Sequence, residues 1–444
     1  MTSYRRGFAI GCATALLLTG CGPAPEPESQ PTPEAPEQDT RCLCEPTVPL
    51  TGAPGEAVSS SAPRELAPGA TPREMAAAVA GNTNFGAALL RLSQPGANVF
   101  FSPYSISQAL SMVYAGARGQ TETQMSQVLG SALSQARHHP AMNAVDLAMQ
   151  PGTGGGTGGT PPTFRVVNGT WGRQGFTFEP TFLDVLARQY GAGMRVVDFS
   201  QNASAIRAQI NQWVEEQTMT RIKDLIPVGG VKPDTTLMLV NALYFKGAWA
   251  TPFSKQGTAD APFQTLDGKT RQVPTMRGGT GQYMAGQGFE AVSLDYQGRE
   301  FRMLVVLPAA GRFAEVEGRL SSAFLEDVRS RLSSRYMDIR LPRFEMETAL
   351  PLIPSLSTLG MPDAFSSQAN FSGIARGASL TLASVSHKAF VSVNELGTEA
   401  AAATEVGVGP PSVPELFAVN RPFLFAIEHV ATRNVLFLGR YVSP

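Results

Sequence analysis

The residues that most often do chemistry in proteins are sparse in this sequence and form no familiar catalytic motif. Its four histidines are His138, His139, His387 and His429, and none lies in the His-Glu-x-x-His motif of zinc proteases. No Gly-x-Ser-x-Gly turn occurs, and none of the six lysines has a serine three residues before it, as an acylating Ser-x-x-Lys pair requires. The sequence therefore predicts a protein that is not an enzyme and needs no cofactor or metal, with a dispersed carboxylate site as the alternative.

Cysteine chemistry is confined to the N-terminal segment. All four cysteines precede residue 45, namely Cys12, Cys21, Cys42 and Cys44. The remainder of the chain therefore has no disulfide, no thiol nucleophile and no thiolate metal site. Cys42 and Cys44 could pair with each other, with another chain or with nothing.

Residues 1–20 have the features of a signal peptide. Arg5 and Arg6 precede a short apolar run that ends at Leu18 and is too short to span a bilayer. The small residues before Cys21 resemble the lipobox of bacterial lipoproteins, which implies lipidation of this cysteine. We therefore expect a secreted protein anchored by lipid at the bacterial cell envelope. An ordinary secretory signal with an incidental cysteine is the alternative.

The next segment and the body differ sharply in composition. Residues 21–72 hold twelve prolines among Glu, Ser, Thr and Ala, with few bulky apolar residues, which predicts a disordered tether. Residues 73–444 are predicted to form one domain, interrupted only by a glycine-rich surface loop at 151–162. The whole chain is 43% hydrophobic and 16% charged with a net charge of -1, and it has no basic stripe. These values predict a large core and no nucleic-acid partner.

The order of the predicted elements indicates the fold class. Helical patterns dominate the first half of the body, whereas strand patterns dominate after about residue 260, without regular alternation. This order favours an α+β fold. The near-continuous apolar run Leu237–Leu243 predicts a central strand that is buried on both faces. A lone histidine on a strand, such as His387, is more often a hydrogen-bonded core residue than a base.

One stretch suits both a strand and an exposed loop. Between Glu395 and Thr404 the sequence is Glu-Leu-Gly-Thr-Glu-Ala-Ala-Ala-Ala-Thr, followed by a Gly/Pro/Val segment that reaches Pro414. Read with a period of two, one face holds only small or apolar-leaning residues from Thr398 to Val408, as in a half-buried strand. A short surface helix capped by Thr398, or a plain loop, fits the local pattern about as well.

Several separate segments resemble the serpin family, in the family's order and over nearly all of residues 75–444. The segments are Asn98–Ser105, Leu239–Trp249, Ser386–Ala389, Asn420–Phe425 and Phe437–Arg440. The resemblance implies three β-sheets with eight or nine helices and an exposed reactive loop at about residues 395–420, which is uninserted in the native protein. It also implies a monomer.

The resemblance assigns roles to particular residues. Ser102, Ser105, Asn241 and His387 match a polar cluster beneath the centre of sheet A, and Trp249 matches an aromatic residue at the top of the opening. The hinge from which the loop would enter the sheet matches Glu395, Gly397, Thr398, Glu399, Ala400, Ala401, Ala402 and Ala403. A small residue at Thr398 is typical of inhibitory members.

The implied function is suicide inhibition of a serine or cysteine protease. The protease cleaves the loop and forms an acyl-enzyme; insertion of about 15 loop residues at about 3.3 Å each then carries it about 50 Å. The family spacing places the scissile bond at Pro411-Ser412, with Val408-Gly409 and Val413-Pro414 as alternatives. Because no Lys or Arg lies between Glu395 and Arg421, an elastase-, subtilisin- or papain-like target is expected rather than a trypsin-like one. The awkward prolines leave a non-inhibitory binding or structural surface protein as the alternative.

Overall fold

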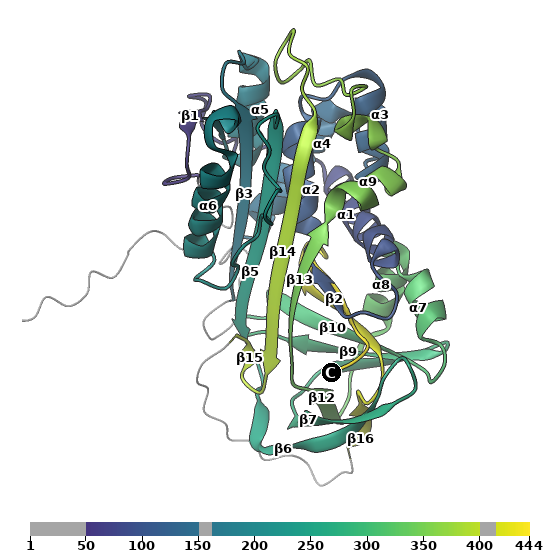
Figure 1. The fold of residues 1–444 in the computed structure, drawn as a ribbon. Helices are drawn as coiled ribbons and strands as arrows, with labels where there is room; N and C mark the ends of the chain where they lie inside the picture. The colour runs from purple at the N-terminus through teal and green to yellow at the C-terminus, as the bar shows by residue number, and fades with distance from the viewer. Residues whose placement is uncertain (1–49, 151–161, 400–413) are drawn as a thin grey trace, which may run out of the picture. The chain divides into compact units, whose positions relative to one another are not determined.

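Three β-sheets and nine α-helices make up the part of the chain described by the computed structural model, residues 50–150, 162–399 and 414–444 (Figure 1). This confirms the predicted α+β class and architecture. The helices are α1 (Pro72–Leu92), α2 (Pro103–Tyr114), α3 (Gly119–Val128), α4 (Gln135–Ala148), α5 (Pro180–Tyr190), α6 (Phe199–Gln217), α7 (Phe313–Arg319), α8 (Ser322–Arg331) and α9 (Leu352–Leu359), with a 3-10 turn η1 at Pro362–Phe365.

Sheet A is a mixed sheet in the order β1-β4-β3-β5-β15-β14-β13, in which β5 also pairs directly with β14. Its strands are β1 (Glu56–Val58), β3 (Thr163–Arg173), β4 (Met194–Val197), β5 (Leu237–Ala248), β13 (Phe344–Pro351), β14 (Leu382–Asn394) and β15 (Gly397–Thr398). As predicted, β5 is buried on both faces: Leu239 and Leu243 join the main core, whereas Met238 and Val240 join a second cluster with α6. Apolar residues on both faces are what a covered central strand requires.

Two smaller sheets complete the fold. Sheet B has the order β11-β8-β9-β10-β17-β18-β2, with β2 (Val99–Phe101), β8 (Gln282–Gly286), β9 (Phe289–Asp295), β10 (Phe301–Pro308), β11 (Ser333–Ser334), β17 (Phe423–His429) and β18 (Val435–Tyr441). Sheet C has the order β16-β12-β7-β6, with β6 (Phe253–Gln264), β7 (Thr270–Gly278), β12 (Met337–Pro342) and β16 (Glu415–Ala418).

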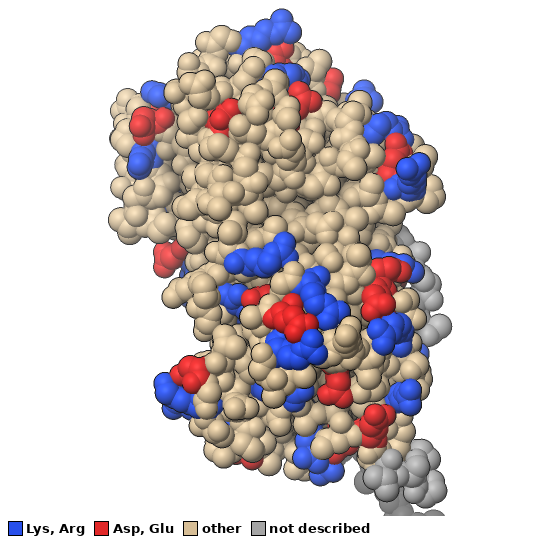
Figure 2. Space-filling view, turned by 90° about the vertical axis from the view of Figure 1, so that its right-hand side faces the viewer, with Lys and Arg blue, Asp and Glu red and all other residues tan. Residues whose placement is uncertain are grey.

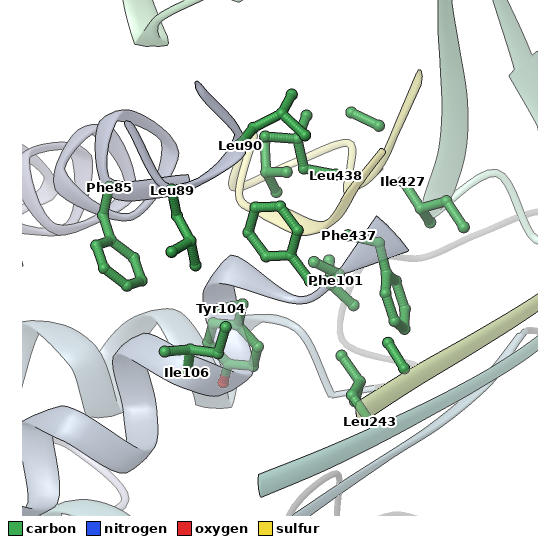
Figure 3. Close-up of a cluster of buried hydrophobic side chains, with 14 of the residues drawn as sticks. Phe85, Leu89, Leu90, Phe101, Tyr104, Ile106, Leu243, Ile427, Phe437 and Leu438 are labelled. Carbon is green, nitrogen blue, oxygen red and sulfur yellow. The ribbon is translucent and has the colours of Figure 1, made fainter. Parts of the chain in front are cut away.

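The main core forms where α1 and α2 meet sheets A and B. Figure 3 shows side chains from α1, from β2 and α2, and from β17 and β18 converging with Leu243 of β5. Phe101 and Phe437 are completely buried there, and Phe85 is 2% exposed. This packing fixes α2 beneath the middle of sheet A, which matters for the polar residues at the start of that helix.

Residues 50–71, which we call the N-terminal strap, pack against the domain, so the prediction of a disordered tether is wrong for this part. Its strand β1 pairs antiparallel with β4 at the edge of sheet A. The indole N–H groups of Trp171 and Trp213 donate to the carbonyl oxygens of Pro54 and Thr51, at 3.0 and 3.1 Å. These partners lie 117 and 162 positions later in the chain, so composition alone could not show them. Residues 21–49 lie outside the described part.

Charged side chains are interspersed on the face that carries α7 and α8. Figure 2 shows Lys and Arg beside Asp and Glu over the lower part of this face, and a largely uncharged area above. Ion pairs such as Arg312–Glu315 on α7 and Arg331–Asp327 on α8 contribute to this pattern. Within the described residues, no helix is long and apolar enough to cross a membrane.

Candidate functional site

A buried polar cluster joins three elements at the middle of sheet A. It consists of Ser102, the N-cap of α2, Ser105 in the first turn of that helix, Asn241 on β5 and His387 on β14, all at most 1% exposed. The backbone N–H of Ser102 donates to Nε2 of His387 at 3.2 Å, and the N–H of Ser105 donates to Oγ of Ser102 at 3.0 Å. Asn241 donates through Nδ2 to Ser105, and its Oδ1 contacts Nδ1 of His387. The cluster therefore ties both strands to the helix beneath them.

His387 is a neutral hydrogen-bonding residue in this cluster. Because its Nε2 accepts from Ser102, the ring proton lies on Nδ1 and is donated to Asn241. Burial lowers the pKa of His387 to about 3, so the ring stays uncharged at neutral pH. In the parallel register of β5 and β14, His387 lies directly opposite Asn241. A strand that enters between β5 and β14 has to break their contact.

Asn168 on β3 is a fifth member of the cluster that the sequence analysis missed. Its Oδ1 accepts a hydrogen bond from Nδ2 of Asn241, and it lies opposite Asn241 in the β3–β5 register. The side chain is 6% exposed. The available signal was an amide directly after Val166 and Val167 in a predicted body segment, since a buried amide needs partners.

At the other end of β5, the sheet is already parted and occupied. In the described part of the chain, direct pairing of β5 with β14 ends at Leu243 and Ala389, and β15 then lies between the two strands. Thr398 is opposite Val393 on one side and Gly247 on the other. Figure 1 shows this short strand beside the end of β14. The expectation of an uninserted native loop is therefore wrong for Gly397 and Thr398.

Gly397 fits here because both backbones come very close. Its φ is +149°, a conformation that favours glycine, and an added Cβ would lie 2.1 Å from the carbonyl oxygen of Gly247. Gly247 is itself constrained, because a Cβ there would lie 2.9 Å from the ring of Tyr296. Gly397 and Gly247, which are diagonal neighbours in the β15–β5 register, thus make the space that admits β15.

Thr398 and Trp249 meet around a shared tyrosine. The Thr398 side chain is 1% exposed, and its hydroxyl is 2.8 Å from the hydroxyl of Tyr296. Tyr296 stacks on Trp249 with ring centroids 4.6 Å apart, and the indole N–H of Trp249 donates to the carbonyl oxygen of Asn394 at 2.9 Å. Trp249 is therefore separate from the polar cluster, and it holds the segment that leads into the hinge.

Glu395 fixes the start of the hinge. Its carboxylate accepts hydrogen bonds from Thr258 at 2.7 Å and from Arg343, and its carbonyl oxygen accepts from the N–H of Phe253 at 2.9 Å. Burial by itself would raise the pKa of Glu395, but the hydrogen bonds from Arg343 and Thr258 outweigh it and hold the pKa below its usual range. The carboxylate is thus ionised and anchored at neutral pH.

Glu399 follows the last residue of β15 and has a left-handed backbone conformation. Its φ is +53°, a left-handed conformation that costs a residue other than glycine about 1–2 kcal/mol. Its N–H still donates to the carbonyl oxygen of Ser392 at 3.0 Å, so the ladder continues one step past Thr398. Its carboxylate pairs with Arg221 at 3.2 Å, and Arg221 also lies over the ring of Phe390. Glu399 is therefore held by contacts to both β14 and Arg221 directly after β15.

The other predicted site residues lie outside the described part of the chain. They are Ala400, Ala401, Ala402 and Ala403 of the hinge, Pro411 and Ser412 at the predicted scissile bond, and Cys21 at the predicted lipidation site. The remaining histidines lie away from the cluster, His138 and His139 in α4 and His429 at the end of β17. No group of His, Cys, Asp and Glu suited to a metal ion occurs among the described residues.

A family model for serpins, described as serine protease inhibitors, matches residues 80–444. Leukocyte elastase inhibitor A of Rattus norvegicus is 36% identical over 368 residues, covering 79% of this chain and 94% of that protein. An uncharacterised serpin-like protein of Thermococcus kodakarensis is 36% identical over 353 residues, covering 78% of this chain and 81% of that protein. A family of inhibitors is consistent with the predicted lack of enzymatic activity.

Solved structures also match this fold over most of the chain. Human thyroxine-binding globulin, solved in complex with thyroxine, has a TM-score of 0.75 and 29% identity, covering 84% of this chain and 99% of that one. Uncleaved ovalbumin has a TM-score of 0.74 and 30% identity, covering 83% of this chain and all of the other. The fold is thus shared by proteins that carry very different names.

Proposed function

The chain belongs to the serpin family, and from this premise we propose that it inhibits a protease by inserting its cleaved loop into sheet A. The observation that carries the proposal is β15, because the first two residues of the insertion already pair with both β5 and β14. The rest of the loop then needs only to continue an existing strand. Extending a strand that is already paired costs less conformational entropy than starting a new one, because the loop is already aligned with β5 and β14.

The established register predicts where each loop residue would go. Continued residue by residue, it brings Thr404 between His387 and Asn241 and Val406 between Val385 and Leu239. It reaches Leu237, the first residue of β5, at Val408. We call the space between β5 and β14 that the inserted strand would occupy the slot. In this register the slot takes residues 397–408 and no more.

The residues that would face the core in this register are all of small or moderate size. Thr398 points to the side of β5 that carries Leu239 and Leu243, and the alternate residues that follow it are Ala400, Ala402, Thr404, Val406 and Val408. Small side chains matter because overpacking a core costs about 1–3 kcal/mol. Thr404 would also bring a hydroxyl to the polar cluster, where a separated His387 and Asn241 need new partners.

The prolines near the predicted cut fall outside the paired stretch. Pro410 and Pro411 follow Val408 and Gly409, where the register has already reached the first residue of β5. Proline lacks the N–H that a central strand donates, so a proline within the slot would block pairing. From Glu399 to Pro411, about 3.3 Å per residue would carry an attached protease roughly 40 Å. Such a displacement can distort the protease before its acyl bond is hydrolysed.

The proposed targets are proteases that accept small or apolar residues. The loop between Glu395 and Arg421 contains no Lys or Arg, which disfavours trypsin-like enzymes. A relative that is 36% identical is named as an inhibitor of leukocyte elastase. We therefore place elastase-like and subtilisin-like serine proteases first and papain-like cysteine proteases second, with cleavage at Pro411-Ser412 or at the neighbouring Val408-Gly409 or Val413-Pro414.

A panel of these proteases tests the proposal. Incubation at equal molar amounts should give an adduct that survives denaturing electrophoresis, and mass spectrometry of the released C-terminal fragment should locate the cut. Trypsin is the matched control and should give no adduct through this loop. Cleavage by every member of the panel without any adduct would contradict inhibition.

A non-inhibitory binding protein is the second candidate, motivated by the Gly409-Pro410-Pro411 sequence and by the similarity to thyroxine-binding globulin. It makes a different prediction. Cleavage of the loop should then leave the thermal unfolding temperature unchanged, whereas insertion should raise it strongly.

Anchoring to a membrane is a separate part of the proposal and rests on the sequence before Cys21. We propose that Cys21 is lipidated and holds the inhibitor at the bacterial cell envelope. In that case the wild-type protein should partition into detergent and label with fatty acid, and Cys21→Ser should do neither. Labelling that persists in Cys21→Ser would contradict it, and Cys12→Ser is the matched control.

A further inference from the structure

The N-terminal strap is attached to the half of sheet A that must move if the loop inserts. A new strand between β5 and β14 separates them by one further interstrand spacing, about 4.8 Å. The strands on the β5 side are β3, β4 and β1, and the last of these belongs to the strap. Figure 1 shows β1 at the edge of the sheet near α6. Any movement of this edge therefore involves the strap.

The first part of the strap is seated on the cluster between sheet A and α6. Ala53 is 6% exposed and packs there with Trp171 of β3 and Trp213 of α6. Both indoles donate to strap carbonyl oxygens, and Arg195 of β4 donates to the carbonyl oxygen of Gly55 at 3.1 Å. This half of the strap thus follows β3, β4 and α6.

The second part of the strap, which includes Arg64 and Glu65, is hydrogen-bonded to helices α4 and α5. Arg64 donates to Oδ1 of Asn143 on α4 at 2.8 and 3.0 Å and pairs with Asp146 on the same helix at 2.5 Å. The N–H of Glu65 donates to the carbonyl oxygen of Arg188 on α5 at 2.8 Å. Because Asp146 is only 2% exposed, its carboxylate is a buried charge, and the ion pair with Arg64 compensates for that burial.

The anchor of the strap leads to the helix beneath the polar cluster. The second carboxylate oxygen of Asp146 accepts a hydrogen bond from the hydroxyl of Tyr104, which lies in the first turn of α2. Ser102 and Ser105 flank Tyr104 in the chain and hold His387 and Asn241. The strap therefore links the movable edge of sheet A to the helix that fastens its centre.

We propose that the N-terminal strap restrains the opening of sheet A, with Ala53 and Arg64 as its two points of attachment. The inference rests on the proposed insertion mechanism. With both ends attached, β4 and β3 cannot separate from α4 and α2 without breaking the indole bonds or the Arg64–Asp146 pair. Release of either end lowers the barrier to insertion, so the strap sets how long the native state persists. Both residues are positioning residues, because they act through the sheet.

Two variants release the strap from opposite ends. Ala53→Asp places a charge in the apolar cluster, and Ala67→Asp makes the same substitution at an exposed position of the strap as its control. Arg64→Met removes the partner of Asp146, and Arg73→Met, also exposed, is the control for loss of an arginine. If one releasing variant fails to fold, the other decides, because the two act at separate sites.

The measurement is the rate at which the intact full-length protein converts to an inserted form on warming. Conversion is followed by loss of adduct formation with a susceptible protease and by the appearance of a form that unfolds at higher temperature. Ala53→Asp and Arg64→Met should each convert about tenfold faster than wild type, equivalent to about 1.4 kcal/mol of barrier, and both controls within about twofold.

The outcomes separate the strap from the function on which it rests. If wild-type protein gains stability on loop cleavage but released and control variants convert at equal rates, the strap proposal is wrong and insertion stands. If cleaved wild-type protein gains no stability, insertion itself is wrong, and the strap proposal is wrong with it. Hydrogen exchange at Met194–Val197 confirms release of β1 in each variant.

Discussion

The hinge end and the centre of the slot in sheet A are held together by different kinds of contact. At the hinge end, β15 already separates β5 from β14, and the contacts are a close approach of Gly397 to Gly247, a threonine hydroxyl and stacked aromatic rings. At the centre, the same strands pair directly and are joined by the buried cluster of Asn241, His387 and Asn168. The slot is thus open where the hinge enters and fastened where the rest of the loop has to follow.

This difference separates what starts insertion from what resists it. The hinge end supplies alignment, because Thr398 is buried in register with both neighbours. The centre supplies the barrier, because buried polar groups that lose their partners cost about 1–3 kcal/mol each. A metastable native state needs both, and its lifetime is governed by the barrier. Variants at the hinge end and variants at the centre should therefore behave differently.

The largest effect is expected at the hinge end from Thr398→Arg. Thr398 is 1% exposed, and an unpaired buried charge costs several kcal/mol, so β15 should leave the sheet and insertion should fail. The yield of protease adduct should fall at least about 100-fold while cleavage of the loop continues. Electrophoresis of timed reactions measures both products. Thr398→Ser keeps the hydroxyl and should retain trapping; an undiminished adduct with Thr398→Arg would refute the role of this end.

A smaller and opposite effect is expected at the centre from His387→Ala. The substitution leaves the N–H of Ser102 and Oδ1 of Asn241 without their present partner, which should destabilise the native protein by about 1–3 kcal/mol. Opening should become easier, so spontaneous insertion should accelerate. His429→Ala is the control, because His429 is also buried but lies in sheet B and contacts Thr432. Equal acceleration in both variants would show that general destabilisation, not the cluster, sets the rate.

Acid should weaken the centre before it weakens the hinge end. His387 has a pKa of about 3 when folded and about 6.5 when unfolded, so between these values the unfolded state binds the proton and the folded state does not. Stability therefore falls as the pH drops below about 6.5, by about 2 kcal/mol at pH 5 for each such histidine. Burial also lowers the pKa of His429 and of His138 to about 4 and holds that of His139 well below its usual range, so all four histidines add to the same trend.

Thermal unfolding between pH 7 and pH 5 measures this dependence. Because each histidine contributes only part of it, His387→Gln should reduce the pH dependence, and so should His429→Gln. Only His387→Gln should also remove the acceleration of insertion by acid. An unchanged pH dependence in His387→Gln would mean that this histidine does not report on the centre of the sheet.

The smallest effect is expected at the ion pair between Arg221 and Glu399, the residue that directly follows β15. In this pair the Glu399 side chain is 4% exposed but Arg221 is 52% exposed, so solvent around the guanidinium screens the pair, which contributes about 0.5–1 kcal/mol. Arg221→Met should speed insertion by about twofold in the same warming assay. Arg376→Met breaks a more exposed ion pair, with Glu179, away from the slot and should leave the rate unchanged. A slower rate in Arg221→Met would mean that the pair assists insertion.

The sequence predicted the central strand from its side-chain types, whereas the polar cluster was implied by the resemblance to serpins. The near-continuous apolar run of β5, which only Asn241 interrupts between Leu237 and Leu243, is visible in the order of residues. Asn168 was missed because a single amide in an apolar strand has no local sign of its partner. The pairing of Gly397 and Thr398 was missed because it depends on the space at Gly247, which only the folded backbone defines.

The N-terminal strap shows most clearly what composition cannot give. Its prolines and small residues are typical of disorder, and by themselves they bury little apolar surface. Its order comes from partners elsewhere, chiefly the two indoles and the unpaired edge of β4. Backbone carbonyl groups are present in every residue, so no pattern of side chains marks the ones that are bound.

The central claim is that the cleaved loop becomes a strand between β5 and β14, and hydrogen exchange tests it most directly. Beyond Leu243 and Ala389 these strands no longer pair with each other in the described structure. Amide exchange across Tyr244–Lys246 and Phe390–Ser392 should slow strongly after a protease cuts the loop, as the new strand fills the slot. Unchanged exchange in both segments, in protein shown by mass spectrometry to be fully cleaved, would contradict insertion.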